Sequence, residues 1–229
     1  MEVSNGVKIL GIDTATKFLS LGIYDNAKVY EYNLEVGRQL SSLLVLTIKR
    51  VLDAPGLRIQ EIDYFACGLG PGSFTGMRTG LATIKGLSWA LNKPVIGIST
   101  LDILAKNVRE SDRLIVPIVD AKRGLVYCSV FKNKNGSLLR IRPYMLLSPR
   151  DCLKEIKGNA IILGDAVELY RDKILMNLRE AIILDKDYWY PKPHSIIELA
   201  LERIKRKEFD SSFKIKPIYL YPKDCQVRK

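Results

Sequence analysis

Along the first hundred residues, the apolar positions alternate between the period of a strand and that of a helix. Three strand-like runs with a tight turn at Asp25-Asn26 predict an antiparallel meander, and they are residues 8–12, 19–24 and 28–34. From Leu40 the apolar positions lie three or four residues apart, which predicts a helix that ends near Pro55-Gly56. The chain is therefore expected to open with three strands and a helix.

The elements that follow alternate between strand and helix. Their expected bounds are a strand at 64–68, a helix at 76–91, a strand at 95–99 and a helix from Thr100. The order βββαβαβα implies a mixed sheet, in which later strands join a hairpin in parallel through crossover helices. This order resembles the ribonuclease H-like half that actin, Hsp70 and sugar kinases share.

The second part of the chain repeats this theme. Its expected elements are a meander of strands at 114–119, 125–131 and 138–147, with a turn at Asn135-Gly136, and short strands at 160–163 and 181–184. Ser148-Pro149 fits a helix start, and Ser195 with Glu198 fits a capping box. We therefore expect a two-lobed actin-like α/β fold, with a mixed sheet and flanking helices in each lobe. The expected lobes are residues 1–106 and 107–229.

The composition, 47% hydrophobic and 27% charged, is typical of a globular protein. The apolar runs are shorter than the about 18 residues of a membrane span, and no secretory signal is visible. We expect a cytoplasmic protein that does not enter the membrane. The four cysteines have neither metal-knuckle nor disulfide spacing and are expected to be reduced. A single histidine, His194, excludes a metal site built on paired histidines, so no metal site is predicted.

The net charge of +11 is unevenly distributed. The first 102 residues hold 10 basic and 9 acidic side chains, whereas the remaining 127 residues hold 26 and 16. This excess indicates either a polyanionic partner or a solvated surface rich in Lys and Arg.

A glycine-rich segment, residues 68–76, lies between a predicted strand and a predicted helix. Backbone N–H groups near glycines and at a helix N-terminus suit a phosphate group. The spacing matches neither a Walker loop nor a Rossmann loop, and a purely structural turn is the alternative. The phosphate-binding candidates in this segment are Gly70, Gly72, Ser73, Thr75 and Gly76.

A carboxylate follows the first strand of each expected lobe. Asp13, beside the hydroxyls of Thr14 and Thr16, has the chemistry to hold a hydrated Mg²⁺ next to a phosphate. Asp120 occupies the matching strand end in the second part. The alternative is that each carboxylate orders a turn.

The helix predicted at 76–91 carries small residues three or four positions apart. Each glycine costs about 1 kcal/mol of helix propensity relative to alanine. Since small side chains let another backbone approach closely, we expect tight packing within the lobe or across a subunit interface. These residues are Gly76, Gly80, Thr83, Gly86 and Ala90.

Several segments together resemble the bacterial TsaB family, part of the machinery that makes threonylcarbamoyladenosine in tRNA. The most specific of them is the Gly-Pro-Gly-Ser-Phe-Thr-Gly run. The likeness spans residues 8–130 and continues afterwards only in a tail motif. Its segments are residues 9–16, 70–78, 95–101, 120–127 and 217–220.

The resemblance implies a non-catalytic scaffold subunit that supports the catalytic relative TsaD, with the ATPase TsaE, in modifying N6 of adenosine 37. It implies no required cofactor, although ATP or ADP with Mg²⁺ would bind weakly at the boundary of the complex. In TsaD a metal is held by a His-x-x-x-His motif. This chain has only His194, so the metal and the transfer chemistry are not carried over.

The same resemblance places the surface for TsaD on two helices of the N-terminal lobe, and implies that the isolated chain forms a homodimer through that surface. Contact with tRNA would be made through the complex. The implied interface residues are Leu40, Leu43, Leu44, Ile48, Val51, Gly76, Met77, Gly80, Thr83 and Leu87.

Two further hypotheses remain. The chain could be a self-sufficient actin-like ATPase or small-molecule kinase, using Asp13 and the glycine-rich segment on phosphates and Asp120 as a Mg²⁺ anchor or base. Its basic C-terminal part could form an accessory tRNA surface accompanied by the aromatic residues Tyr219 and Tyr221. The candidate residues for tRNA contact are Arg203, Lys205, Arg206, Lys207, Lys214 and Lys216.

Overall fold

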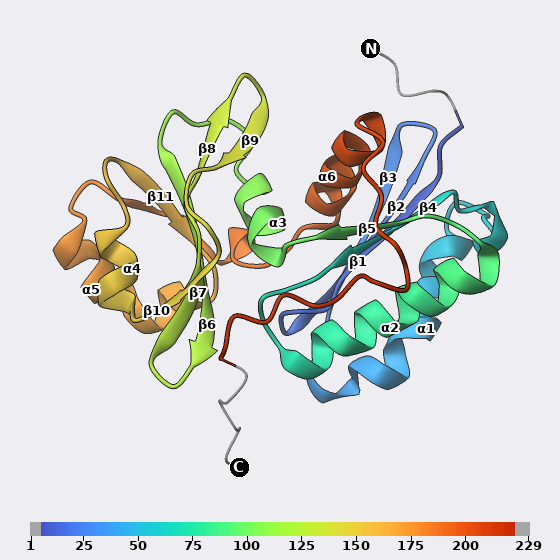
Figure 1. Cartoon of the computed structure of the whole chain (residues 1–229), viewed down its shortest axis with the longest axis horizontal. Helices are drawn as coiled ribbons and strands as arrows, with labels where there is room; N and C mark the ends of the chain where they lie inside the picture. Colours follow the sequence, from blue (N-terminus) through green and yellow to red (C-terminus); the bar gives the residue numbers. More distant parts are fainter. Residues whose placement is uncertain (1–5, 223–229) are drawn as a thin grey trace. The chain divides into compact units, whose positions relative to one another are not determined.

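The computed structural model describes residues 6–222, which belong to two compact units (Figure 1). The first unit combines Met1–Ile103 with Pro191–Pro217, and the second combines Leu104–Tyr190 with Ile218–Lys229. The expected division at residues 106 and 107 differs from this, because residues 191–217 return to the first unit. None of the helices in the described part of the chain has the length and apolar character needed to cross a lipid bilayer.

The first unit is built on a five-stranded mixed sheet, as the order of elements predicted. Its strands are β1 (Ile9–Asp13), β2 (Phe18–Asp25), β3 (Lys28–Glu35), β4 (Tyr64–Gly68) and β5 (Val95–Ile98). They are arranged in the order β3-β2-β1-β4-β5. The first three form an antiparallel meander, and β4 and β5 run parallel to β1.

Helices cover both faces of this sheet (Figure 1). The helices α1 (Leu40–Asp53) and α2 (Phe74–Leu91) lie on one face, and α6 (Pro193–Lys205) lies on the other. The helix α3 (Thr100–Lys106) follows β5, and single 3₁₀ turns occur at Gly37–Gln39 and Ile59–Glu61. The alternation of side chains along a strand explains the two cores. Leu10 of β1 packs toward α1 and α2, whereas Ile9 packs toward α6.

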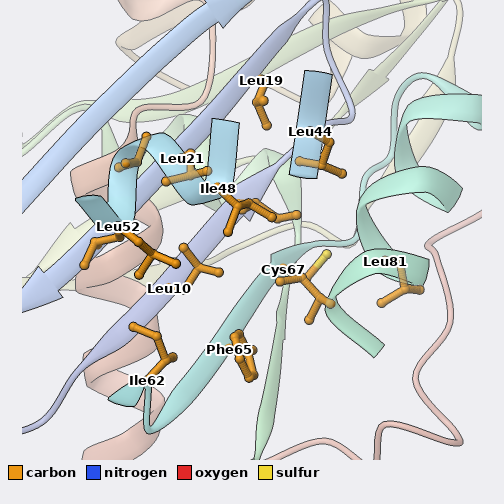
Figure 2. Packing of buried hydrophobic residues seen from close by; sticks show 14 of the residues in the cluster. Leu10, Leu19, Leu21, Leu44, Ile48, Leu52, Ile62, Phe65, Cys67 and Leu81 are labelled. Carbon is orange, nitrogen blue, oxygen red and sulfur yellow. The ribbon is translucent and has the colours of Figure 1, made fainter. Parts of the chain in front are cut away.

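The larger core lies between the sheet and the pair α1 and α2. Figure 2 shows Leu10, Phe65, Leu44, Ile48 and Leu81 converging there. Burying an apolar side chain of this size stabilises the fold by about 1.5–3 kcal/mol relative to leaving it exposed. This face of α1 and α2 is therefore committed to the sheet.

The helix α6 rests directly on the backbone of the meander. Gly11 and Gly22 face each other in the β1–β2 ladder. A Cβ at Gly11 would lie 2.8 Å from the side chain of Ile196, and a Cβ at Gly22 would lie 3.1 Å from that of Ile197. The two glycines thus let α6 approach the sheet closely, although it is separated from β2 by more than 160 residues of sequence.

The second unit contains a seven-stranded mixed sheet, whose main path is β10-β7-β6-β11-β12, with β8 and β9 joined beside β6. Helices α4 and α5 pack against it. A 3₁₀ turn spans Lys186–Tyr188. The strands and helices are β6 (Leu114–Lys122), β7 (Leu125–Cys128), β8 (Phe131–Lys134), β9 (Ser137–Arg140), β10 (Met145–Leu147), α4 (Pro149–Lys154), β11 (Ala160–Leu163), α5 (Ala166–Asn177) and β12 (Ile182–Ile183).

Several expected elements of the second part are corrected. The strand expected at 125–131 divides into β7 and β8, because β7 pairs with β10 while β8 pairs with β9. The strand expected at 138–147 divides likewise into β9 and β10. Helix α5 was not predicted, because its apolar residues do not form a clear stripe along one face.

Two expected helix starts also move. Helix α2 begins at Phe74 rather than residue 76, because the Ser73 hydroxyl accepts a hydrogen bond from the Gly76 N–H and caps it. Helix α6 begins at Pro193, so the capping box expected at Ser195 and Glu198 does not form. Proline at the first helical position lacks an N–H that would otherwise be unsatisfied there, which favours this earlier start.

Candidate functional site

Asp13 ends β1 in a fully buried position within the first unit. Its Oδ1 accepts a hydrogen bond from the Ala15 N–H at 2.8 Å, and its Oδ2 accepts one from the Thr100 hydroxyl at 2.6 Å. Gly68 leaves the space for this carboxyl group, since a Cβ there would overlap it. The carboxyl group therefore joins the ends of β1 and β4 to the start of α3.

Thr14 fills the space that glycines of α2 leave open. Its hydroxyl donates to the Gly76 carbonyl at 2.8 Å, and a Cβ at Gly80 would overlap the Thr14 Oγ1. A Cβ at Gly76 would overlap the Thr14 carbonyl oxygen. The small residues in the first turns of α2 thus allow Thr14 to pack closely against this helix within the unit.

The glycine-rich segment is bound to the same turn. The Ser73 N–H donates to the Ala15 carbonyl at 2.7 Å, and a Cβ at Gly72 would overlap that oxygen. The Gly70 N–H donates to the Thr100 hydroxyl at 3.1 Å. The segment that suits a phosphate in sequence is therefore held by backbone and hydroxyl groups of the protein itself.

Burial controls the ionisation of the acid groups here. Burial raises the pKa of Asp13 to about 6, although the hydrogen bonds from Thr100 and Ala15 act in the opposite direction. Burial, with the nearby Asp13, also raises the pKa of the Cys67 thiol. A carboxyl group with no exposed surface has no access to a hydrated cation, so in this conformation Asp13 serves the structure.

The phosphate-binding candidates of this unit fall into three groups by exposure. The buried ones are Asp13, Thr14, Gly70 and Gly76, whereas Thr16 and Gly72 are half-buried and Ser73 and Thr75 are exposed. Only the exposed group is open to a ligand from solution. The alternative, that the segment is a structural turn, accounts for the contacts of the buried residues.

Asp120 lies in the second unit, near the end of β6, where it pairs with Val126 of β7. Its Oδ1 accepts the Lys122 N–H at 2.8 Å, its Oδ2 pairs with the Lys122 Nζ at 2.6 Å, and its N–H donates to Asp165 Oδ1 at 2.9 Å. Lys122 has a φ of +65°, a conformation that local hydrogen bonds help to hold. Burial raises the pKa of Asp165, and the Asp120 hydrogen bond raises that of Lys122.

His194 and the acidic groups do not gather around a common centre. Its Nδ1 lies 3.3 Å from Glu31 Oε2, at the start of α6. Over residues 6–222, no three His, Cys, Asp or Glu side chains are grouped so that they could hold a metal ion.

Most of the expected interface residues are buried within the first unit. Leu40, Leu44, Ile48 and Val51 pack into the larger core, Met77 is buried, and Gly76 and Gly80 lie against Thr14. Leu43, Thr83 and Leu87 are half-buried. The stripe at helical spacing marks the face that the two helices bury against their own sheet, and contact with a partner stays a prediction for the half-buried residues.

The solvent face of the same two helices carries apolar residues that the periodicity did not single out. Val45 and Leu46 of α1 are 63% and 56% exposed. On α2, small residues are exposed: Ala82, Gly86 and Ala90. The sequence signal that could have identified this surface is the pair of apolar residues on the otherwise polar face of α1.

The tRNA candidates are also divided by the structure. Arg203 is held inside the first unit, where its guanidinium group donates to Asp210 at 3.0 Å and pairs with Glu208 at 3.7 Å. The others are exposed: Lys205, Arg206, Lys207, Lys214 and Lys216. Tyr221 packs in the second unit, where its hydroxyl donates to the Ala121 carbonyl at 2.8 Å.

Comparison with known proteins adds to this geometry. The family model TsaD, described as tRNA N6-adenosine threonylcarbamoyltransferase, matches residues 34–212. A Bacillus subtilis (strain 168) protein named tRNA threonylcarbamoyladenosine biosynthesis protein TsaB is 32% identical over 170 residues, 72% of this chain and 74% of that protein. The Escherichia coli (strain K12) protein of the same name is 24% identical over 220 residues, 93% of this chain and 94% of that protein.

A solved structure shares the fold. It is a Pseudomonas aeruginosa protein described as uncharacterized, with similarity to peptidase YEAZ. It superposes with a TM-score of 0.82 at 23% sequence identity, over 94% of this chain and all of that one. The expected fold class is thereby confirmed.

Asp13 makes stability depend on pH. Its pKa of about 6 in the folded protein exceeds the ordinary value of 3.8, so the folded state binds the proton more tightly. The free energy of unfolding should therefore fall by up to about 3 kcal/mol as pH rises from about 4 to above 6. Asp13→Asn cannot ionise and should lack this fall in urea unfolding measured across that range. Parallel pH profiles for both proteins would assign the titration to another group.

Gly80→Ala should lower the free energy of unfolding by about 1–3 kcal/mol, because its methyl group overlaps the Thr14 hydroxyl. Adding Thr14→Ala should recover part of this loss. Gly86→Ala is the matched control, since nothing lies within 4 Å of its Cβ, and should stabilise by up to about 1 kcal/mol. Equal effects of the two glycine substitutions in urea unfolding would contradict the proposed fit.

Proposed function

This chain belongs to the TsaB family of tRNA threonylcarbamoyladenosine biosynthesis proteins, and from this membership we propose that it acts as a non-catalytic subunit that binds and supports a TsaD protein. In this role it takes part in forming N6-threonylcarbamoyladenosine at position 37 of tRNA. A TsaE protein joins the two subunits. The TsaB family is established by the 32% identity to the Bacillus subtilis protein over 72% of this chain, and the match to the TsaD model over residues 34–212 supports an association with TsaD.

The residues of this chain favour a role in support of TsaD over catalysis of the threonylcarbamoyl transfer. Its single histidine cannot supply the two imidazoles of the His-x-x-x-His motif. Asp13, which would be the natural anchor for a cation near a phosphate, is fully buried and used in internal hydrogen bonds. The same burial counts against the alternative of a self-sufficient ATPase or kinase.

The exposed face of α1 and α2 is the observation that carries the proposal. Val45 and Leu46 place two large apolar side chains in contact with water. The neighbouring helix α2 (Figure 1) exposes the small residues Ala82, Gly86 and Ala90. Such a surface suits a partner that approaches the helix backbone closely.

Gly86 is the most specific feature of this face of α2. The glycines at positions 76 and 80 are explained by contacts with Thr14, but a Cβ at Gly86 would meet nothing within 4 Å. A glycine in a helix interior costs about 1 kcal/mol relative to alanine. A partner that packs on this face of α2 would account for that cost. In the absence of TsaD, a second copy of the chain covers the same face as a homodimer.

Reconstitution tests the function. Combining TsaD, TsaE, tRNA, ATP, threonine and bicarbonate with the adenylate-forming enzyme should give modified adenosine only when this chain is present. The modified nucleoside is measured by mass spectrometry after digestion of the tRNA. Undiminished modification without the chain would reject the proposal, and turnover of ATP by the chain alone would favour the kinase alternative.

Substitutions on the exposed face test the surface. Val45→Asp and Gly86→Arg should each weaken binding to TsaD at least tenfold in calorimetry, because both disrupt an apolar contact while leaving the core unchanged. Leu169→Asp is the matched control, since Leu169 is 61% exposed on α5 of the second unit. Unaltered affinity of the first two variants, or an equal loss in the control, would place the TsaD surface elsewhere.

A further inference from the structure

A groove of about 340 Å³ opens in the first unit where α2 ends and β5 begins. One wall is the last turn of α2 with Asn92 and Lys93, and the other is the segment from Asp210 to Phe213. That segment is fixed in place, because the Asp210 N–H donates to the Val95 carbonyl at 2.8 Å. The groove is therefore a formed feature of the unit, with hydroxyl, amide and ammonium groups along its lining.

Two large aromatic rings stand in solvent beside this groove. Phe213 lines it and is 77% exposed, and Trp89, three residues before Asn92 on α2, is 72% exposed. Lys85, one helical turn before Trp89, donates from its Nζ to the carbonyls of Phe213 and Ile215 at 3.5 Å each. Lys85 and Trp89 share one flank of α2, so the segment that carries Phe213 runs along that flank.

Exposed basic residues flank the segment that lines the groove. Lys214 and Lys216 follow Phe213, and Lys205, Arg206 and Lys207 lie at the end of α6 and just after it, before Asp210. The acidic groups of the region are paired internally. Asp210 and Glu208 contact Arg203, and Asp63 lies 3.7 Å from Lys93 Nζ. The charge left facing solvent is positive.

We propose that this groove binds a single-stranded segment of RNA. Unpaired nucleobases stack on the faces of Phe213 and Trp89, and the phosphates between them lie against the lysine and arginine side chains. The hydroxyl groups of Ser211 and Ser212 are placed to contact ribose or base edges. Exposed aromatic rings next to cationic side chains suit RNA better than they suit an apolar protein partner. The rings match the nucleobases, and the cations match the phosphates.

The inference rests on the proposed function, since a tRNA supplies unpaired loop nucleotides. Trp89 points away from the core, because Leu87, two positions earlier, packs into it and two positions turn the helix by about 200°. Ala82, seven positions before Trp89, lies on nearly the same line along α2, so the proposed RNA surface borders the face proposed for TsaD. Binding of TsaD is therefore measured for the same variants as binding of RNA.

Fluorescence anisotropy with a labelled RNA stem-loop of anticodon type measures this binding, using the full chain alone and the chain saturated with TsaD. Trp89→Ala and Phe213→Ala should each weaken the affinity about 5- to 100-fold. Lys214→Glu with Lys216→Glu should weaken it further and reduce its dependence on salt. Lys157→Glu, an exposed charge of the second unit, is the matched control and should lower affinity much less.

Tryptophan emission supplies a second readout. The chain has two tryptophans, and Trp189 is only 4% exposed, so stacking on Trp89 should quench most of the accessible emission. Trp89→Phe keeps a stacking ring and should retain binding within about fivefold while losing the quench. If the alanine variants bind RNA like the parent, the inference is wrong. If they instead lose TsaD, the groove is a protein surface, and the need for the chain in reconstitution still decides the proposed function separately.

Discussion

The close approach of the Asp13–Ala15 turn to α2 is the constraint on which the first unit depends. Thr14 reaches the helix only because positions 76 and 80 lack side chains, and Ala15 reaches the loop only because position 72 does. These contacts fix the start of α2 against the end of β1. They also bury the carboxyl group of Asp13 between Gly68 and Thr100. The same contacts that hold the helix in place thus close the position where a cation would be expected.

The side of α2 that packs on Thr14 and the sheet is buried, whereas its other side is exposed to solvent. Its exposed side carries the small residues Ala82, Gly86 and Ala90 and, near its end, Trp89. The glycines of α2 therefore differ in their surroundings. Gly80 accommodates Thr14, while a Cβ at Gly86 would meet nothing within 4 Å. The sequence alone does not separate these two cases, because both give the same small-residue spacing.

The sequence predicted the first sheet well, because β1, β2 and β3 are short local elements with clear turns. The apolar stripe of α1 was also predicted correctly as one face of a helix, but it was assigned to a partner as well as to the sheet. The stripe is buried against the sheet, and the sequence of the helix alone does not show which of the two covers it. The exposed Val45, Leu46 and Phe213 were missed because no periodicity marks an apolar residue that stands alone. The contact of Thr14 with Gly80 joins positions 66 residues apart, which spacing does not reveal.

The return of α6 to the first sheet has a consequence for how the chain is made. A ribosome delivers β1 through β5 first, then all of the second unit up to residue 190, and only afterwards the helix that covers Gly11 and Gly22. Until residues 193–205 emerge, one side of the nascent sheet is bare of its partner helix. The strands of the second sheet all end by residue 183, so that sheet can form while the first sheet still lacks α6, and the earliest-translated strands are among the last to be covered.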